Sequence, residues 1–119
     1  MANQNILQWN CRGFQANYDD ITVLTQEQNP VVLCLQETFY NPNKPINIKH
    51  FTGYHKQAVM TNDKANGGVS TFIRNNSPQR EIKLTTNLQA QAVSVTLRKS
   101  FSICNLYIPP SYKPKAEEI

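Results

Sequence analysis

Residues 31–37 read Val-Val-Leu-Cys-Leu-Gln-Glu (VVLCLQE), an uninterrupted apolar run that ends in two polar side chains. A strand buried on both faces has this composition, as the central strands of parallel sheets do. An earlier segment, residues 5–11 (NILQWNC), alternates instead, so that Leu7, Trp9 and Cys11 share one face of a strand. The sequence therefore predicts two strands of one sheet, the second of them central.

The chain between these strands carries the signals of a single helix. Arg12-Gly13 breaks the first strand, and Asn17 stands where a helix N-cap is expected. Residues 29–30 (Asn-Pro) end the helix, because the residue before proline avoids the helical region. Strand, helix and strand in this order form a right-handed βαβ unit. The carboxyl ends of both strands then meet at one edge of the sheet.

The second half of the chain reads mainly as strands. Residues 41–66 are polar and predict a long loop with little regular structure, apart from a short strand near Tyr54. Further strands are predicted at residues 69–74, 81–84, 92–97 and 101–108. The last two alternate cleanly and flank Arg98-Lys99-Ser100, so they predict a hairpin that ends at the following two prolines. The fold class is therefore α/β (α+β).

Length and composition restrict the class of protein. The 119 residues, 39% apolar and 17% charged, suit one globular domain spanning residues 1–119. We find no apolar run of membrane-spanning length and no signal peptide, and so expect an intracellular protein, nuclear or cytoplasmic, without a membrane partner. Three scattered cysteines, Cys11, Cys34 and Cys104, predict buried free thiols rather than disulfides or a zinc site.

Charge is distributed unevenly along the chain. Residues 1–60 carry four basic and four acidic side chains, so the whole net charge of +4 lies in residues 61–119. A basic bias suits a polyanionic partner such as DNA, and Arg74, Arg98 and Lys99 are candidate phosphate contacts. The alternative for these three is that they are ordinary solvated charges at strand ends. His50 and His55 are predicted to be exposed loop histidines rather than general bases.

Two oxygen-bearing side chains end the strands of the predicted βαβ unit. Asn10 ends the first strand and Glu37 ends the second, at the edge where ligands bind in open α/β sheets. Such a pair could hold a hard divalent cation that keeps several waters. Tyr107 ends the last strand and could donate a hydrogen bond to a phosphate oxygen. The alternatives are a turn cap for Asn10, a solvated Glu37 and a half-buried aromatic at position 107.

Four segments in order resemble one known family. They are QWNCRG (8–13), VVLCLQET (31–38), GGVSTFIRNN (67–76) and ICNLYIPP (103–110). Together they resemble the N-terminal half of the endonuclease/exonuclease/phosphatase superfamily. The amino-acid sequences of the second and fourth segments are most similar to the endonuclease domain of non-LTR (LINE-type, jockey-like) retrotransposons. The resemblance implies half of a two-sheet sandwich, with one mixed sheet that contains the βαβ unit, and a C-terminal hairpin.

The resemblance also implies roles for three residues. Asn10 corresponds to an active-site asparagine near the metal and the scissile phosphate, Glu37 to the ligand of the divalent metal, and Tyr107 to a phosphate-contacting tyrosine. The cofactor implied is Mg²⁺ (or Mn²⁺), and the implied reaction is hydrolysis of DNA phosphodiester bonds, in which a retrotransposon nicks its target. Gln36 and Thr38 are expected to support the site.

Two further motifs of the family, Asp-x-Asn and Ser-Asp-His, have no counterpart in this sequence. They position or activate the attacking water, so we expect this chain alone to be inactive, a fragment of such an endonuclease. The alternatives are a non-catalytic retroelement remnant or a DNA-binding fragment. The full-length protein would add the C-terminal half of the domain and a reverse transcriptase. An apolar sheet face left uncovered by that half predicts marginal stability or self-association.

Overall fold

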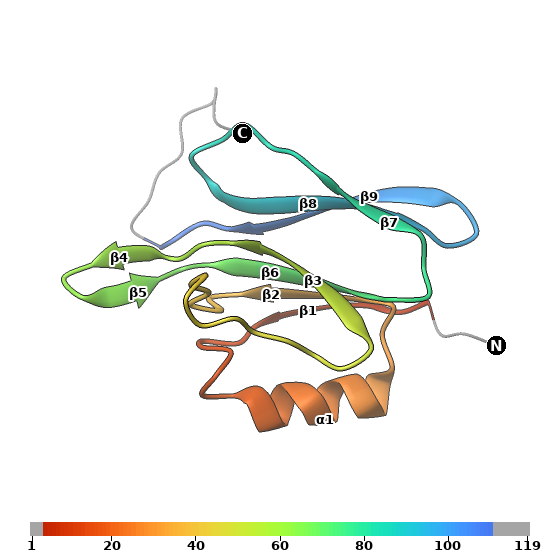
Figure 1. Ribbon diagram of the computed structural model, residues 1–119, viewed down its shortest axis with the longest axis horizontal. Coiled ribbons are helices and arrows are strands. Elements are labelled where there is room, and N and C mark those ends of the chain that lie inside the picture. Colours follow the sequence, from red (N-terminus) through yellow and green to blue (C-terminus); the bar gives the residue numbers. More distant parts are fainter. Residues whose placement is uncertain (1–3, 111–119) are drawn as a thin grey trace.

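Helix α1 (Tyr18–Gln28), a four-stranded sheet and a three-stranded sheet form stacked layers in the computed structural model, which describes residues 4–110 (Figure 1). The strands are β1 (Ile6–Asn10), β2 (Val32–Gln36), β3 (Phe51–Lys56), β4 (Val59–Thr61), β5 (Lys64–Asn66), β6 (Val69–Arg74), β7 (Gln79–Ile82), β8 (Gln89–Thr96) and β9 (Ser100–Tyr107). The first sheet has the order β1-β2-β6-β3 and the second the order β7-β8-β9, while β4 and β5 form a separate hairpin. In the described range, no helix is long and apolar enough to cross a membrane.

The βαβ unit is present as predicted. Strands β1 and β2 run parallel, in a register that places Asn10 opposite Gln36. Alternation along β1 turns Leu7 and Trp9 towards the helix layer, where they pack on a core that includes Ile21 of α1. All five residues of β2 are buried, as expected for a central strand.

Asn17 occupies the predicted N-cap position of α1 but does not cap the helix with its side chain. Its Nδ2 atom instead donates backwards, to the carbonyl oxygen of Cys11 at 2.7 Å and of Gly13 at 3.2 Å. The amide therefore ties the start of the helix to the loop that follows β1. The helix ends where predicted, at Asn29, whose backbone is left-handed (φ 45°).

The C-terminal hairpin, β8 and β9, does not extend the mixed sheet. Together with β7 it forms a second sheet that covers the inner face of β2 and β6. Val93 and Val95 of β8 are fully buried there against Val32 and Ile73. The α/β class and the partial sandwich are thus confirmed, and the predicted hairpin belongs to the second sheet of the sandwich rather than to the mixed sheet. Alternation shows that a strand has an apolar face without showing which sheet covers that face.

The predicted uncovered sheet face is correspondingly smaller. What stays open is the inner face of edge strand β1 and part of edge strand β9, where Ile6 is 50% and Leu106 is 41% exposed. Each of these strands pairs with only one neighbour among residues 4–110, β1 with β2 and β9 with β8. Self-association through these surfaces stays a prediction.

The segment 41–66 is more regular than predicted. It contains β3, which includes the expected strand at Tyr54, and the short hairpin of β4 and β5. Asn62 and Asp63 turn this hairpin with left-handed backbones (φ 50° and 63°), which asparagine and aspartate tolerate well. The hairpin projects from the edge of the molecule at which β2 ends (Figure 1). The sequence signal was weak because these strands are short and mostly polar.

Candidate active site

An open hollow of about 690 Å³ lies at the carboxyl ends of β1 and β2. Asn10, Glu37 and Tyr107 all line it, although they come from three different strands or strand ends. The remaining lining residues are Gln8, Arg12, Cys34, Gln36, Cys104, Asn105, Leu106, Ile108 and Pro110. The structure therefore brings together the three residues that the sequence singled out, in the gap between the two sheets.

Glu37 reaches the hollow through an unusual backbone conformation. Its φ of 52° is left-handed, which interrupts the strand alternation directly after Gln36, the last residue of β2. The main chain on either side is fixed, because Gly13 N donates to the Glu37 carbonyl at 2.7 Å and Thr38 N donates to the Gly68 carbonyl at 3.0 Å. Strained backbone of this kind persists where surrounding contacts over-determine it, and it concentrates at functional sites.

Tyr107 is coupled to Glu37. Burial raises the pKa of the Tyr107 phenol, and a hydrogen bond to the Glu37 carboxylate and the charge of that carboxylate raise it further. The phenol therefore stays protonated at neutral pH and lines the same hollow as Glu37. A protonated tyrosine is also able to donate to a phosphate oxygen.

The side-chain oxygen atoms of Asn10 and Glu37 at the rim of the hollow fit a hard divalent cation. Glu37 supplies a carboxylate, and Asn10, which is exposed, supplies a carboxamide oxygen. Mg²⁺ binds through one or two carboxylates, keeps several waters and takes further oxygens from a phosphate substrate. Residues 4–110 contain no cluster of three or more His, Cys, Asp or Glu side chains that could enclose a metal ion. The rim therefore suits one side of an open Mg²⁺ or Mn²⁺ site rather than a closed metal cage.

Arg12 is a cation at the hollow that sequence reasoning missed. It lies two residues after the end of β1, is exposed, and has a left-handed backbone (φ 51°) like Glu37. Its position beside Asn10, just after the first strand of a βαβ unit, was a signal that could have identified it.

The three predicted phosphate contacts lie away from this hollow. Arg98 and Lys99 are exposed in the turn between β8 and β9, whereas Tyr107 lies at the opposite end of β9. Arg74 donates to the Pro30 carbonyl at 3.0 Å and to Asn29 Oδ1, and its guanidinium lies 4.8 Å from the centre of the Phe51 ring. Contact of these three side chains with DNA stays a prediction.

Replacing Arg74 with alanine is expected to lower the free energy of unfolding by about 1–2 kcal/mol, because hydrogen bonds and a cation–π contact are lost together. Chemical denaturation would measure the change. Arg98→Ala, at an exposed turn, is the control and should change stability by less than about 0.5 kcal/mol. Equal effects for the two arginines would contradict a structural role for Arg74.

His55 is not the exposed loop histidine that the sequence predicted. It lies half-buried in β3, stacked on Tyr40 with ring centroids 4.1 Å apart, and its Nδ1 atom is 2.8 Å from Ser70 Oγ. Burial lowers the pKa of His55 to about 4. The prediction failed because the surrounding polar segment hid a strand whose neighbours cover the ring.

The lowered pKa of His55 predicts a pH dependence of stability. A histidine in the unfolded chain takes up a proton near pH 6.5, whereas His55 in the folded protein does so near pH 4. The contribution of neutral His55 to folding stability is therefore fully present above pH 6.5. It is expected to decline between pH 6.5 and 4 and to level off below. His55→Phe should remove this part of the decline when unfolding is measured across that range. An identical slope in both proteins would contradict the buried neutral imidazole.

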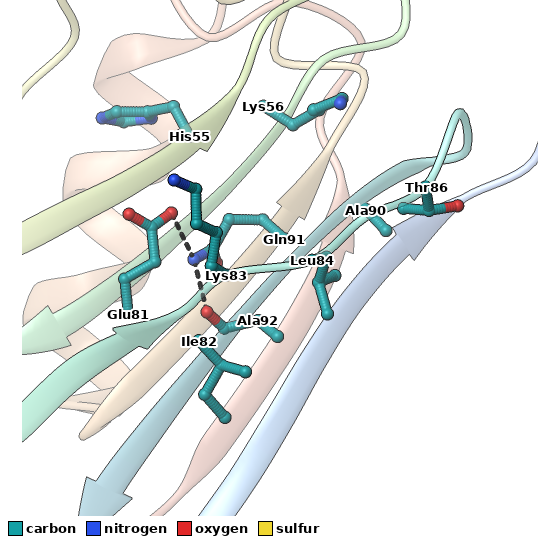
Figure 2. A pocket seen from close by; sticks show the side chains of 10 residues that line it. All are labelled: His55, Lys56, Glu81, Ile82, Lys83, Leu84, Thr86, Ala90, Gln91 and Ala92. Atoms are coloured by element: carbon teal, nitrogen blue, oxygen red, sulfur yellow. Dashed lines mark hydrogen bonds between the residues drawn. The ribbon is translucent and has the colours of Figure 1, made fainter.

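A second hollow, of about 490 Å³, lies between β3 and the β7–β8 pair (Figure 2). Gln91 is 3% exposed there, and its Nε2 atom donates to Glu81 Oε2 at 3.3 Å and to the Ala92 carbonyl at 2.7 Å. Its Oε1 atom has no hydrogen-bond partner among residues 4–110. None of the predicted site residues lines this hollow, so it is separate from the candidate active site.

The cysteines are free, as predicted, but only two of them are buried. Burial raises the pKa of Cys11 and of Cys34 to about 11, so both thiols are protonated and unreactive at neutral pH. Cys104 is exposed, contrary to the prediction, because it lies on the edge strand β9 where that strand borders the open hollow.

These features define a class of protein: a two-sheet α/β sandwich with the oxygen-bearing side chains of Asn10 and Glu37 at the carboxyl ends of its first two strands. The sequence profile of the Endonuclease/Exonuclease/phosphatase family matches residues 7–95, and the chain belongs to this family. No curated protein matches the sequence.

Two solved structures show the same fold. AP endonuclease LMAP from Leishmania major superposes with a TM-score of 0.63 at 15% identity, covering 89% of this chain and 40% of that one. An AP endonuclease from Archaeoglobus fulgidus superposes with a TM-score of 0.56, also at 15% identity, covering 94% of this chain and 44% of that one. The chain thus spans less than half the length of either neighbour.

Proposed function

We propose that this chain is the N-terminal part of a divalent-metal-dependent endonuclease that hydrolyses phosphodiester bonds in DNA, and that it supplies the metal-binding side of the active site. The single observation that carries the proposal is the convergence of Asn10, Glu37 and Tyr107 on one hollow at the carboxyl ends of β1 and β2. The fold of the two AP endonucleases supports DNA as the substrate class.

Each rim residue has a distinct role in the proposed reaction. Glu37, with the Asn10 carboxamide, binds Mg²⁺ or Mn²⁺, and the metal would offset negative charge on the phosphate. Tyr107 donates a hydrogen bond to a phosphate oxygen, and the exposed guanidinium of Arg12 attracts the DNA backbone. Glu37 and Tyr107 line the same hollow, so one bound phosphate group would be within reach of both.

The protein of origin is proposed to be a non-LTR retrotransposon that nicks its target DNA, with a reverse transcriptase elsewhere in the full-length protein. The amino-acid sequence of residues 31–38 and 103–110 supports this origin. The sequence contains neither an Asp-x-Asn nor a Ser-Asp-His motif, and nothing identified among its residues positions the attacking water. We therefore propose that this chain binds metal and DNA without turnover.

The test combines binding and cleavage. Purified protein would be titrated with Mn²⁺ under electron paramagnetic resonance, beside Glu37→Gln, which keeps the shape of the side chain and removes its charge. Removing this ligand is expected to weaken Mn²⁺ binding by at least about 10–100-fold. A variant that binds Mn²⁺ as tightly as the wild type would contradict the metal role of Glu37.

In the same preparation, supercoiled plasmid with Mg²⁺ should remain unnicked, because the loss of several catalytic groups removes far more than the roughly 10²–10⁴-fold that each contributes. Nicking by the wild type, absent from Glu37→Gln, would show that the chain is an enzyme by itself. It would also rule out the alternative of a non-catalytic remnant.

A further inference from the structure

Three amide side chains beside the hollow connect the strands that supply its rim. Gln8, Gln36 and Asn105 come from β1, β2 and β9, and all three line the hollow. Gln36 is 6% and Asn105 is 2% exposed. A buried carboxamide costs free energy unless its donors and acceptors are hydrogen-bonded. The hydrogen-bond partners of Gln36 and Asn105 therefore show which strands these side chains connect. We call these three side chains the amide relay.

The relay is a continuous chain of hydrogen bonds. Gln8 Nε2 donates to Gln36 Oε1, and Gln36 Nε2 donates to Asn105 Oδ1 at 2.7 Å. Asn105 Nδ2 then donates to the carbonyl oxygens of Leu35 at 3.1 Å and Ser70 at 2.9 Å. Every amide donates in the same direction, so each bond polarises the next. The relay runs from β1 through β2 to β9 and ends on β2 and β6.

Each relay residue stands one or two positions before a residue of the proposed active site. The pairs are Gln8 with Asn10, Gln36 with Glu37, and Asn105 with Tyr107. Residues two apart in a strand share a face, so fixing Asn105 also fixes the direction of Tyr107. Strand β9 pairs only with β8 among the described strands, and no ladder joins it to β1 or β2. Side-chain contacts must therefore set its place relative to Glu37.

We propose that the amide relay positions the active-site rim, with Gln36 and Asn105 holding Tyr107 against Glu37 across the gap between the sheets. Gln8 joins β1, and with it Asn10, to the same unit. These three are positioning residues, since none of them is assigned a contact with metal or phosphate. The catalytic importance of Asn10, Glu37 and Tyr107 rests on the proposed function. The effect of the amide relay on the positions of these three side chains does not depend on that function.

The experiment uses the full 119-residue chain and the variant Gln36→Met, which keeps the length of the side chain and removes its hydrogen bonds. Two readouts are needed: the nuclear Overhauser contact between the Tyr107 ring and the Glu37 side chain without metal, and the Mn²⁺ affinity. The contact should weaken or vanish, and the affinity should fall by about tenfold or more, the usual effect of removing a group that orients a metal ligand.

A matched control is Gln79→Met at the far edge of the second sheet. Gln79 Nε2 donates to the carbonyl oxygens of Arg74 and Ser77, each at 2.9 Å, so this variant also removes amide hydrogen bonds between elements. It should leave both readouts unchanged. Because Gln36 is buried, Gln8→Met at the exposed end of the relay is the second variant. It should lower the Mn²⁺ affinity by releasing Asn10, while the Gln36–Asn105 hydrogen bond keeps Tyr107 in place, and its Mn²⁺ affinity decides the question if Gln36→Met does not fold.

The outcomes separate the two proposals. A folded Gln36→Met or Gln8→Met protein that loses stability but keeps the Tyr107–Glu37 contact and its Mn²⁺ affinity would show a purely structural relay and overturn the inference. If the wild type binds no Mn²⁺ at all, the proposed function fails, and the Tyr107–Glu37 contact alone then supports or overturns the relay.

Discussion

Gly68→Ala is expected to destabilise the protein by about 2–4 kcal/mol and to displace Glu37. Gly68 has a left-handed backbone (φ 82°), and an added Cβ atom would lie 2.9 Å from the backbone nitrogen of Tyr40 and 3.2 Å from that of Phe39. These atoms belong to the main chain that follows Glu37, and they cannot move without moving it. Chemical denaturation would measure the loss of stability, and Mn²⁺ titration would measure the effect on the site.

The neighbouring glycine supplies a matched control. Gly67 has a similar φ of 76°, but the atoms nearest to a Cβ atom there belong to the Gln89 side chain, from 3.2 Å, rather than to the main chain after Glu37. Gly67→Ala should therefore cost the backbone strain and a shift of the Gln89 side chain, with a smaller loss of stability and little change in Mn²⁺ affinity. Equal losses of affinity in both variants would show that the close approach of Gly68 to residues 39–40 does not support Glu37.

Phe72→Ala should cost about 3–5 kcal/mol, the typical loss for a buried phenylalanine. Phe72 is 1% exposed in the middle of β6, stacks on Phe14 with ring centroids 5.7 Å apart, and meets the edge of the His55 ring at 5.6 Å. It thus joins the loop after β1 to β3, and removing it leaves a cavity that rigid sheets do not close. A small domain has only about 5–15 kcal/mol of total stability, so the variant should be largely unfolded on warming.

Phe101→Ala is the control for this prediction, because Phe101 is 47% exposed on β9. It should change the free energy of unfolding by less than about 0.5 kcal/mol. Thermal denaturation followed by circular dichroism would compare the two. A comparable loss from Phe101 would mean that an additional surface packs against β9, as self-association would require.

Local pattern was enough to predict the elements that position the site. The apolar run of residues 31–37 predicted the central strand, and the helix signals between Asn17 and residues 29–30 predicted the crossover. These features are local because strand burial and helix caps depend on residues close in sequence. The carboxyl ends of β1 and β2 lie at one edge because the helical crossover returns the chain to the start of the sheet and makes the strands parallel, so the closeness of Asn10 to Glu37 was predictable.

Other features depend on contacts between distant segments, and the sequence predictions failed there. His55 reads as a loop histidine until Tyr40 and Ser70 are placed on either side of it. Arg74 reads as a free cation until Asn29 and Phe51 are found around its guanidinium. In both cases the partners lie more than ten residues away, and no periodic pattern encodes them.

The sequence by itself was enough to predict the βαβ unit, the family resemblance and the three residues at the rim of the hollow. These features depend on short segments of apolar and polar residues. Only the tertiary structure decided that β7, β8 and β9 form a facing sheet, and that Tyr107 therefore lines the same hollow as Glu37. The physical reason is that alternation specifies which face of a strand is apolar, whereas packing of the whole chain selects the surface that covers it.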